Sequence, residues 1–267
     1  MGISLNKIHS AKAYLKYWLK AKDEHSVHSP YIFNLINQVL YDTNSFYKFE
    51  EIEGIRNVLL NSKISFDFQD FGAGSTIIKG ERRFVKDIAK WGTVNARQGT
   101  ILFKLAHFIK PKVVLELGTS LGFSTMYLAS GTTGQIHTIE ADKTLLELSK
   151  QNFKQLKLKN IESYQGTFND VLPTILKPGT LIDIAFIDGH HDREATLNYF
   201  KQIVPFMSKS GVLIFDDIHW SKGMTEAWKD ICQSNEVTVS IDLFNMGLVF
   251  LNPDFTKQHF VLKSSKQ

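Results

Sequence analysis

The stretch that decides the fold is Leu115-Glu116-Leu117-Gly118-Thr119-Ser120-Leu121-Gly122-Phe123-Ser124. An apolar run enters a turn with two glycines, and a helical pattern follows at once. Gly118 allows a tight backbone turn beside a ligand, and Gly122 allows close approach at the start of the helix. The sequence therefore predicts a strand, a ligand-binding turn and a helix at this place.

Two carboxylates accompany the turn. Glu116 lies in the turn region, where it would repel a pyrophosphate but could hold a cationic amino group. Glu140 ends the next predicted strand, where a carboxylate can accept hydrogen bonds from both hydroxyls of a ribose. The spacing Gly-x-x-x-Gly also differs from the dinucleotide pattern Gly-x-Gly-x-x-Gly, which weakens a nicotinamide interpretation.

Strands and helices alternate on either side of this stretch. Short apolar runs with an acid at or near their end occupy 113–117, 136–140, 184–188 and 212–216. Helical patterns lie near 123–130, 143–158, 191–207 and 222–233. Continuous apolar runs are typical of strands buried on both faces of a parallel sheet. The alternation predicts an α/β, doubly wound, Rossmann-like sheet with helices on both faces.

The two ends of the chain depart from this alternation. Residues 237–244 and 248–251 flank a turn and predict a closing antiparallel pair. Helices are expected at 8–22, at 30–41 with Ser29 as cap and Pro30 as first helical residue, and at 50–61. We expect a helical N-terminal region over 1–92, as a substrate cover or an oligomer contact, followed by a domain over 93–267.

The first of these helices is amphipathic. Its apolar residues recur every three or four positions, with lysines between them. They are Ile8, Ala11, Leu15, Trp18 and Leu19. Three places remain open for this face: the chain's own domain, a second subunit in a homodimer, or a membrane surface.

Composition and charge exclude several classes of protein. The 267 residues are 43% hydrophobic and 22% charged, an ordinary globular composition, with one cysteine, Cys232. A single cysteine favours a reducing, cytoplasmic setting, and we expect no transmembrane segment. The net charge of +4 comes from eight lysines at 1–22 and 256–267, which leave the remaining chain at −4. We therefore expect no nucleic-acid partner for the core.

Acidic side chains also follow two later strands. Asp188 follows one apolar run, and Asp216 with Asp217 follows the next. Neighbouring strands of a doubly wound sheet deliver such residues to one crevice, where three carboxylates would repel each other unless a cation lies between them. Oxygen ligands suit a hard divalent ion, with Mg²⁺ the first choice. Such an ion could lower the pKa of a substrate hydroxyl.

Taken together, the glycine turn and the acid that ends the second strand resemble the class I S-adenosylmethionine-dependent methyltransferases over roughly 93–252. The resemblance implies a seven-stranded sheet with an antiparallel last strand and S-adenosyl-L-methionine as cofactor. Glu116, Gly118 and Ser120 would line its methionine end, Glu140 the ribose, and Gly166-Thr167 the adenine, although Thr167 replaces a common acid. The residues implied for cofactor contact are Glu116, Gly118, Thr119, Ser120, Gly122, Ser124, Glu140, Gly166, Thr167 and Asp188.

The acids at 188 and 216–217 are similar to those of metal-dependent O-methyltransferases of the catechol and macrolide sugar types. Asp-Asp-x-His at 216–219 particularly resembles the sugar type, which makes His219 a candidate general base with Asp188 as the second catalytic candidate. His190 and His191 are weaker candidates. Asp216-Asp217 departs from the Asp-Asn of the catechol type, so the substrate class does not carry over.

Two further segments are open to more than one interpretation. Asp70-Phe71-Gly72-Ala73-Gly74-Ser75 looks like a second cofactor loop but lacks a following helix, and is better explained as a lid or a surface loop. Asn95 and Gln98 are candidates for cofactor approach or for a helix cap.

The sequence favours an S-adenosylmethionine-dependent O-methyltransferase that acts on a hydroxyl of a small molecule with help from a divalent cation. An NAD(P)-dependent oxidoreductase and a non-catalytic nucleotide-binding protein are the alternatives. The glycine spacing argues against the first, and the clustered aspartates argue against the second.

Overall fold

The computed structural model describes residues 5–23, 26–67 and 82–264. Two compact units are present: a first unit of Met1–Asp42 with Leu181–Gln267, and a second unit of Thr43–Thr180. This division differs from the boundary at 92 that the sequence suggests, and the domains 1–92 and 93–267 stay a prediction. The loop at 70–75 lies outside the described residues.

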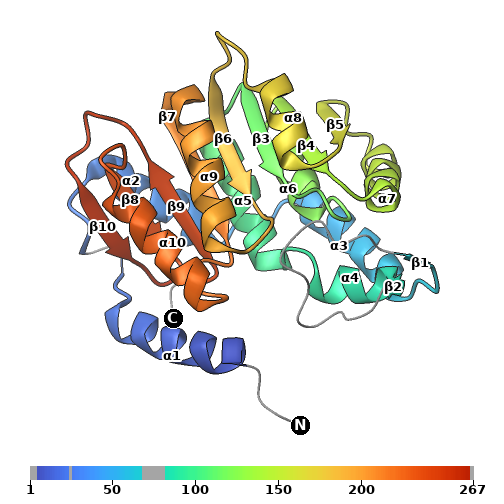
Figure 1. The fold of residues 1–267 in the computed structure, drawn as a ribbon, viewed down its shortest axis with the longest axis horizontal. Helices are drawn as coiled ribbons and strands as arrows, with labels where there is room; N and C mark the ends of the chain where they lie inside the picture. Colours follow the sequence, from blue (N-terminus) through green and yellow to red (C-terminus); the bar gives the residue numbers. More distant parts are fainter. Residues whose placement is uncertain (1–4, 24–25, 68–81, 265–267) are drawn as a thin grey trace. The chain divides into compact units, whose positions relative to one another are not determined.

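The second unit holds three parallel strands in the order β3-β4-β5 (Figure 1). Its elements are α3 (Tyr47–Leu60), β1 (Ser65–Asp67), β2 (Arg82–Phe84), α4 (Val85–Trp91), α5 (Ala96–Ile109), β3 (Val113–Leu117), α6 (Phe123–Gly131), β4 (Gln135–Glu140), α7 (Lys143–Gln155), β5 (Ile161–Gln165) and α8 (Phe168–Ile175). The short β1 and β2 form a separate antiparallel pair. Four of the five residues of β3 are buried, so the strand lacks the alternation of a half-exposed strand.

The first unit holds five strands in the order β10-β8-β9-β7-β6. Its elements are α1 (Leu5–Lys20), α2 (Pro30–Leu35), the π-helical η2 (Ile36–Leu40), β6 (Ile182–Ile187), α9 (Arg193–Ile203), η3 (Val204–Phe206), β7 (Met207–Asp216), α10 (Lys222–Gln233), β8 (Val239–Asp242), β9 (Met246–Phe250) and β10 (Gln258–Val261). β6 and β7 are parallel, whereas β9 is antiparallel to both β7 and β8. The expected α/β class and the antiparallel pair near the C-terminus are confirmed.

The two strand sets contain one strand more than the seven that the family resemblance implies. β10 pairs in parallel with β8, at the edge of the strand set of the first unit. The described residues thus supply eight strands to the two sets, three in the second unit and five in the first. The short run Gln258–Val261 is only partly buried, so it lacks the continuous apolar pattern that marks the inner strands.

Helices cover both faces of the strands in the first unit, as a doubly wound sheet requires. On one face, Trp228 of α10 lies against β9 so closely that a Cβ on Gly247 would stand 2.6 Å from the indole. On the other face, Tyr31 of α2 contacts Phe250 with ring centroids 6.1 Å apart. Positions 247 and 250 are three residues apart in β9, so their side chains point to opposite faces. Figure 1 shows α9 and α10 in front of these strands and α2 behind them.

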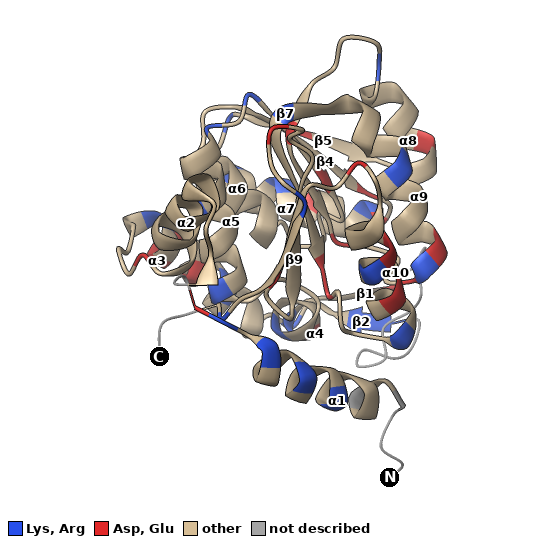
Figure 2. Ribbon diagram, turned by 90° about the vertical axis from the view of Figure 1, so that its left-hand side faces the viewer, with Lys and Arg blue, Asp and Glu red and all other residues tan. Residues whose placement is uncertain are grey.

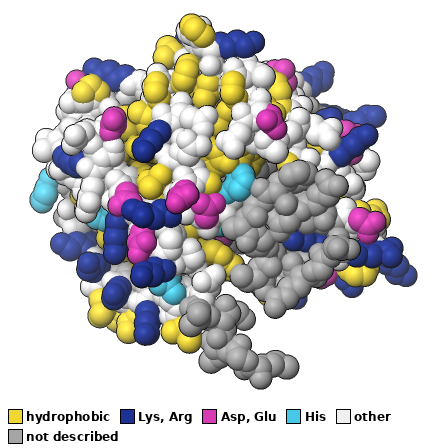
Figure 3. Space-filling view, viewed as in Figure 1, with side chains coloured by type: hydrophobic (Ala, Val, Ile, Leu, Met, Phe, Trp, Pro, Cys, Tyr) yellow, Lys and Arg dark blue, Asp and Glu magenta, His cyan; other side chains and the backbone are white. Residues whose placement is uncertain are grey.

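Helix α1 presents an unexpected face to its own unit. His9 bonds the Thr225 hydroxyl (2.9 Å) and Tyr17 donates to the Leu262 carbonyl (2.6 Å). The apolar residues that the sequence suggested as a docking stripe are instead exposed, with Leu15 at 59% and Leu19 at 70%. Figure 3 shows apolar side chains along the outer edge of α1, and Figure 2 shows lysines but no acids along the helix. None of the helices in the described ranges is long and apolar enough to cross a membrane.

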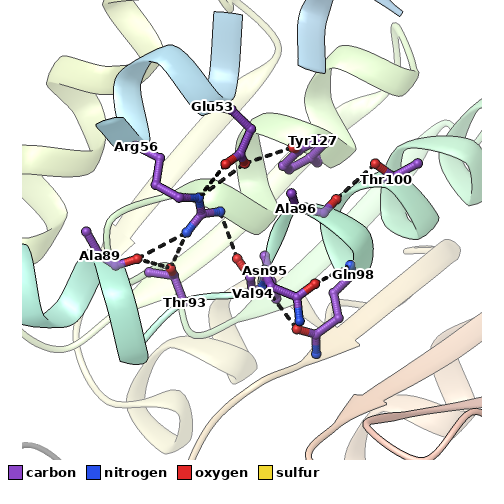
Figure 4. A network of polar contacts seen from close by, with 10 residues as sticks. All are labelled: Glu53, Arg56, Ala89, Thr93, Val94, Asn95, Ala96, Gln98, Thr100 and Tyr127. Carbon is purple, nitrogen blue, oxygen red and sulfur yellow. Dashed lines mark hydrogen bonds and ion pairs between the residues drawn. The ribbon is translucent and has the colours of Figure 1, made fainter. Parts of the chain in front are cut away.

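Arg56 of α3 is the centre of a polar network in the second unit (Figure 4). Its Nε donates to both oxygens of Glu53 (2.9 and 3.1 Å), which also accepts from the Tyr127 hydroxyl (3.0 Å). Nη1 donates to the Thr93 hydroxyl (2.8 Å) and the Ala89 carbonyl, and Nη2 donates to the Val94 carbonyl (2.8 Å). The network fixes α3, α6 and the segment between α4 and α5 relative to one another.

We predict that Arg56→Lys lowers the free energy of unfolding by about 2 kcal/mol, because an ammonium group cannot reproduce the planar fork of donors and leaves buried carbonyls unpaired. Chemical denaturation measures the change. Arg193→Lys is the matched control, since Arg193 holds Asp230 with about half of its side chain exposed, and we expect a change under about 0.5 kcal/mol there. Equal losses in the two variants would contradict the role of Arg56.

Candidate functional site

The glycine turn after β3 has an unusual backbone. Gly118, Ser120 and Gly122 all have positive φ values, of 103°, 49° and 83°. The N–H groups of Gly118 and Thr119 donate to the Ile139 carbonyl (3.1 and 3.2 Å), which joins the turn to β4. Two of the three left-handed positions are therefore glycines, as the sequence suggested, and Ser120 takes the third.

Glu116 is a fully buried carboxylate within the strand that precedes the turn. Its Oε2 accepts from the hydroxyls of Thr138 (2.6 Å) on β4 and Thr125 on α6. The Thr138 hydroxyl lies 2.5 Å from that of Thr119. Glu116 therefore sits at the centre of a hydroxyl cluster that joins β3, β4 and α6, beside the backbone of the turn.

Glu140 lies where β4 ends, and its carboxylate spans the turn. Oε2 accepts from the Ser120 N–H (2.8 Å), and Oε1 accepts from the Asp142 N–H (2.9 Å). Burial raises the pKa of Glu140, while the backbone donors at Asp142 and Ser120 oppose the shift. The backbone of Ala141 also contributes a hydrogen bond that lowers this pKa, so the carboxylate is held by several backbone donors beside the turn.

The remaining residues predicted in this unit have structural partners. Gly166, with φ 147°, donates from its N–H to the Glu140 carbonyl (3.0 Å). Thr167 caps α8 and donates from its hydroxyl to Asp170 (2.6 Å). Ser124 is buried in the first turn of α6. The structure thus brings Gly166 to the end of β4 and uses the Thr167 side chain in a cap.

The segment before α5 approaches the glycine turn. The Ser120 hydroxyl donates to the Gly92 carbonyl (3.2 Å). Asn95 and Gln98 form a capping box, in which each side chain accepts from the backbone N–H of the other (3.0 and 3.1 Å). Of the two interpretations of these residues, the structure displays the helix cap.

In the first unit, Asp188 and Asp217 follow the parallel strands β6 and β7. Asp188 lies 3.5 Å from Nε2 of His191. Burial, the largest cause, and the nearby Asp217 carboxylate raise the pKa of Asp188 to about 6, against the opposing effect of His191. Burial also raises the pKa of Asp217, again opposed by His191. The carboxyl groups of Asp188 and Asp217 are therefore both less acidic than usual, with His191 as the opposing neighbour.

Asp216 and Asp217 have different environments although they are neighbours. Asp216 belongs to β7, pairs with Met246 of β9 and is 7% exposed. Asp217 has left the strand, with φ 52°, and its N–H donates to the Asn245 carbonyl (2.7 Å). Across the described ranges, no group of three metal-ligating side chains is close enough to hold an ion. The pair Asp188 and Asp217 fits the oxygen donors that a hard cation prefers, but two side chains alone do not complete a metal site.

His219 has a partner at each ring nitrogen. Nε2 lies 2.8 Å from Asp242 Oδ2, and Nδ1 lies 3.3 Å from the Thr225 hydroxyl. The ring stacks on Phe244 at an interplanar angle of 26°. The histidine is thus oriented by a carboxylate, as bases in enzymes are, and both of its nitrogens are engaged.

Sequence reasoning missed several residues that organise these sites. Asp242 ends β8 and lies 23 positions after its partner His219. Tyr199 on α9 bonds Nδ1 of His190 (2.8 Å), which gives His190 a structural partner. Arg56 fixes the segment beside the glycine turn. The buried acid at the end of a strand was a signal for Asp242, whereas nothing local in the sequence marks Tyr199 or Arg56.

Comparison with known proteins agrees with this geometry. The model of a methyltransferase domain family matches residues 115–218. A catechol O-methyltransferase of Mycobacterium tuberculosis is 32% identical over 128 residues, 47% of this chain and 56% of the relative. A caffeoyl-CoA O-methyltransferase of Populus trichocarpa is 25% identical over 135 residues, 48% of this chain and 54% of the relative. These matches span only about half the length of the curated relatives.

Solved structures share the fold. An O-methyltransferase from Bacillus cereus in complex with SAH has a TM-score of 0.55 at 18% identity, covering 81% of this chain and 96% of that one. The SAH-bound Podospora anserina methyltransferase PaMTH1 has a TM-score of 0.57 at 14% identity, covering 94% and 98%. The resemblance to class I S-adenosylmethionine-dependent methyltransferases that the motifs indicate is confirmed: residues 115–218 are similar to a methyltransferase domain, and the fold is shared with solved methyltransferases.

Proposed function

We propose that this chain is an S-adenosylmethionine-dependent O-methyltransferase that methylates a hydroxyl of a small molecule with help from a divalent cation. The observation that carries the proposal is the Glu140 carboxylate, which both Ser120 and Asp142 hold beside the glycine turn. A carboxylate at the end of the second strand, held beside the turn in this way, is placed to accept a hydrogen bond from a ribose hydroxyl. The match of residues 115–218 to a methyltransferase domain supports the same conclusion.

In the proposed mechanism, the second unit binds the cofactor. S-adenosylmethionine supplies an electrophilic methyl group on a sulfonium. Glu140 would accept hydrogen bonds from the ribose hydroxyls, the buried Glu116 would add negative charge near the methionine end, and the backbone from Gly118 to Gly122 would form the contact surface. The remaining members of the expected set, Thr119, Ser124, Gly166, Thr167 and Asp188, stay proposed cofactor contacts. Positioning of this kind accounts for much of the rate of a methyl transfer.

The first unit supplies the acceptor side. A divalent cation such as Mg²⁺ would be held by Asp188 and Asp217, with Asp216 as the third proposed ligand, and would supply charge that favours an ionised hydroxyl. The raised pKa values of Asp188 and Asp217 support this proposal, because two carboxylates that share a single imidazole neighbour form an arrangement that a cation stabilises. Mg²⁺ commonly uses one or two carboxylates and completes its shell with water.

The acceptor proton has two proposed destinations. His219 is oriented by Asp242 and could take the proton at Nδ1 by releasing the Thr225 hydroxyl. Asp188, with a pKa of about 6, is the second catalytic candidate.

A homodimer through the N-terminal helices and a cytoplasmic location also remain proposals. The exposed stripe of α1 supports the first, and the single cysteine supports the second. The net charge of −4 between the lysine-rich ends supports a small molecule rather than a nucleic acid as partner.

We predict that S-adenosylhomocysteine raises the melting temperature of the protein and that NAD does not. Glu140→Ala should weaken S-adenosylhomocysteine binding at least about tenfold, because charged hydrogen bonds to the ribose are lost. A thermal unfolding scan measures the melting temperature, and isothermal titration calorimetry measures the affinity. Glu162→Ala is the control, since Glu162 lies on the neighbouring β5 with its side chain 55% exposed. Stabilisation by NAD, or unchanged affinity in Glu140→Ala, would favour the oxidoreductase or scaffold alternatives.

We predict that Asp188→Asn and Asp217→Asn each lower the affinity for Mg²⁺ by about tenfold or more, because each removes a charged oxygen ligand. Isothermal titration calorimetry with Mg²⁺, in the presence of S-adenosylhomocysteine, measures this affinity. Asp254→Asn is the control, because Asp254 pairs with Lys209 and is 67% exposed. If neither variant changes Mg²⁺ binding, the metal proposal fails while the cofactor proposal stands.

We predict that His219→Gln lowers kcat by about a hundredfold while the KM for S-adenosylmethionine stays unchanged, because the variant loses a proton acceptor and not a cofactor contact. Catechol serves as the probe acceptor. His137→Gln is the control, since His137 contacts Tyr164 in the second unit. A wild-type kcat in His219→Gln would leave Asp188 as the proton acceptor.

A further inference from the structure

A cavity of about 530 Å³ lies beneath α1 in the first unit. Its volume is in the range of small-molecule sites. Residues of α1, of α10 and of the ends of β8 and β10 line it, together with His219. The elements that enclose it belong to one compact unit, and α1 is attached there by the His9 and Tyr17 hydrogen bonds.

The charge around this cavity is strongly positive. Lys12, Lys16 and Lys20 recur every four residues along α1, and Lys229 adds a fourth ammonium from α10. Within the described residues none of these four lysines forms an ion pair. The one acid in the lining, Asp242, is already bonded by His219 and by the Phe244 N–H (2.8 Å). The lysines therefore form a surplus of positive charge over the cavity.

Two histidines of the lining have lowered pKa values. Burial, and then His219 and neighbouring lysines, lower the pKa of His9. Burial also lowers the pKa of His259, with Lys20 acting in the same direction and Asp242 against it. Neutral imidazoles offer a hydrogen bond to a ligand without a charge of their own.

The lining of the cavity includes the aromatic ring of Trp228, which is 3% exposed. The ring gives the cavity an apolar wall beside the lysines. The close approach of Gly247 to the indole keeps this ring in place against β9.

The cavity lies at the carboxyl edge of the strands. β7 and β8 are both antiparallel to β9, so they run in the same direction and end at the same edge. Asp242 ends β8, and His219 follows Asp217 by two positions after β7. The cavity thus adjoins the loop that carries the proposed acceptor-side residues.

We propose that this cavity binds the anionic end of the methyl acceptor, which is then a partly apolar small molecule with a carboxylate, sulfonate or phosphate group. The lysines of α1 and Lys229 neutralise the anion, and the Trp228 ring packs against the apolar part of the same molecule. The identification of the ligand as the methyl acceptor rests on the proposed function. The binding of an acidic amphipathic molecule does not depend on it. Lys12, Lys16 and Lys20 line the cavity with exposed side chains, while the apolar stripe of α1 lies elsewhere on the helix.

Two fluorescent probes of nearly the same shape test the binding site. Anilinonaphthalenesulfonate carries an anionic group, and phenylnaphthylamine lacks it. We expect the full-length wild-type protein to bind the sulfonate in a saturable way, about tenfold more tightly than the neutral probe, and to lose this difference as ionic strength rises. Equal affinities for the two probes would overturn the proposal.

Variants locate the site. Lys12→Gln combined with Lys16→Gln should weaken sulfonate binding about tenfold and leave the neutral probe unaffected. Lys201→Gln, an exposed lysine of α9 outside the cavity, is the matched control and should change nothing. The lysine variants alter only exposed side chains, so we expect them to fold as the wild type does. Unchanged sulfonate affinity in the lysine variant would overturn the site.

A transfer assay tests the acceptor role separately. Protocatechuate and catechol differ by one carboxylate, and the double lysine variant should raise the KM for protocatechuate about tenfold without altering kcat or the KM for catechol. Equal effects on both acceptors would overturn the acceptor role. If the probe data hold and neither acceptor is methylated while S-adenosylhomocysteine still binds, the acceptor assignment fails and the anion site remains. If S-adenosylhomocysteine fails to bind, the proposed function itself fails.

Discussion

The buried Glu116 carboxylate is the constraint on which the second unit depends. Burying a charge in a protein is costly unless hydrogen bonds replace water, and each such bond to a charged group contributes about 1.5–3 kcal/mol. Here two threonine hydroxyls, on β4 and α6, provide bonds to Oε2. The strand, the neighbouring strand and the helix after the glycine turn are therefore held in one arrangement. A core built only for stability would place an apolar residue at this position.

The glycine turn and Glu140 follow from that arrangement. Once β3 and β4 are fixed, the turn joins the end of β4 through two N–H groups to the Ile139 carbonyl. Ser120 then reaches the Glu140 carboxylate with its backbone N–H and the Gly92 carbonyl with its hydroxyl. Gly92 precedes the residues that Arg56 holds, so one network connects the turn to the segment before α5. The conformation of the turn therefore depends on its hydrogen bonds to Ile139, Glu140 and Gly92.

The sequence was sufficient for the elements that are buried on both faces. The run 113–117 and the helix at 222–233 have the predicted bounds, because continuous apolar character and a cap at Ser221 leave few alternatives. The capped start at Ser29 and Pro30 was also confirmed. Elements with weaker patterns were missed: α8 contains Pro173, and β10 is only partly buried. Neither shows a periodicity that could be distinguished from a loop.

Proximity of two side chains was predictable only where the order of the strands alone brings them together. Asp188 and Asp217 were expected together because adjacent parallel strands end at one edge, and their effect on each other agrees with this. The pairing of His219 with Asp242 was not, since it depends on the register of β8 against β9. The orientation of α1 was missed for a similar reason. An amphipathic pattern identifies two faces, and which face is turned inward depends on what the rest of the unit offers.

Opposite charges in the first unit lie in two separate groups. Four lysines surround a cavity with one engaged carboxylate, while two carboxylates at the ends of β6 and β7 share one imidazole. Pairing these opposite charges with each other would stabilise the unit, but they are kept in separate groups. Separation of this kind raises the free energy of the ligand-free protein and reserves each group for a partner from outside. The proposed acceptor is an acidic molecule whose hydroxyl must be ionised. Its anionic group would bind the lysines, and a cation held by the two aspartates would favour ionisation of the hydroxyl. Both groups of like charge in the first unit are therefore explained by the proposed chemistry.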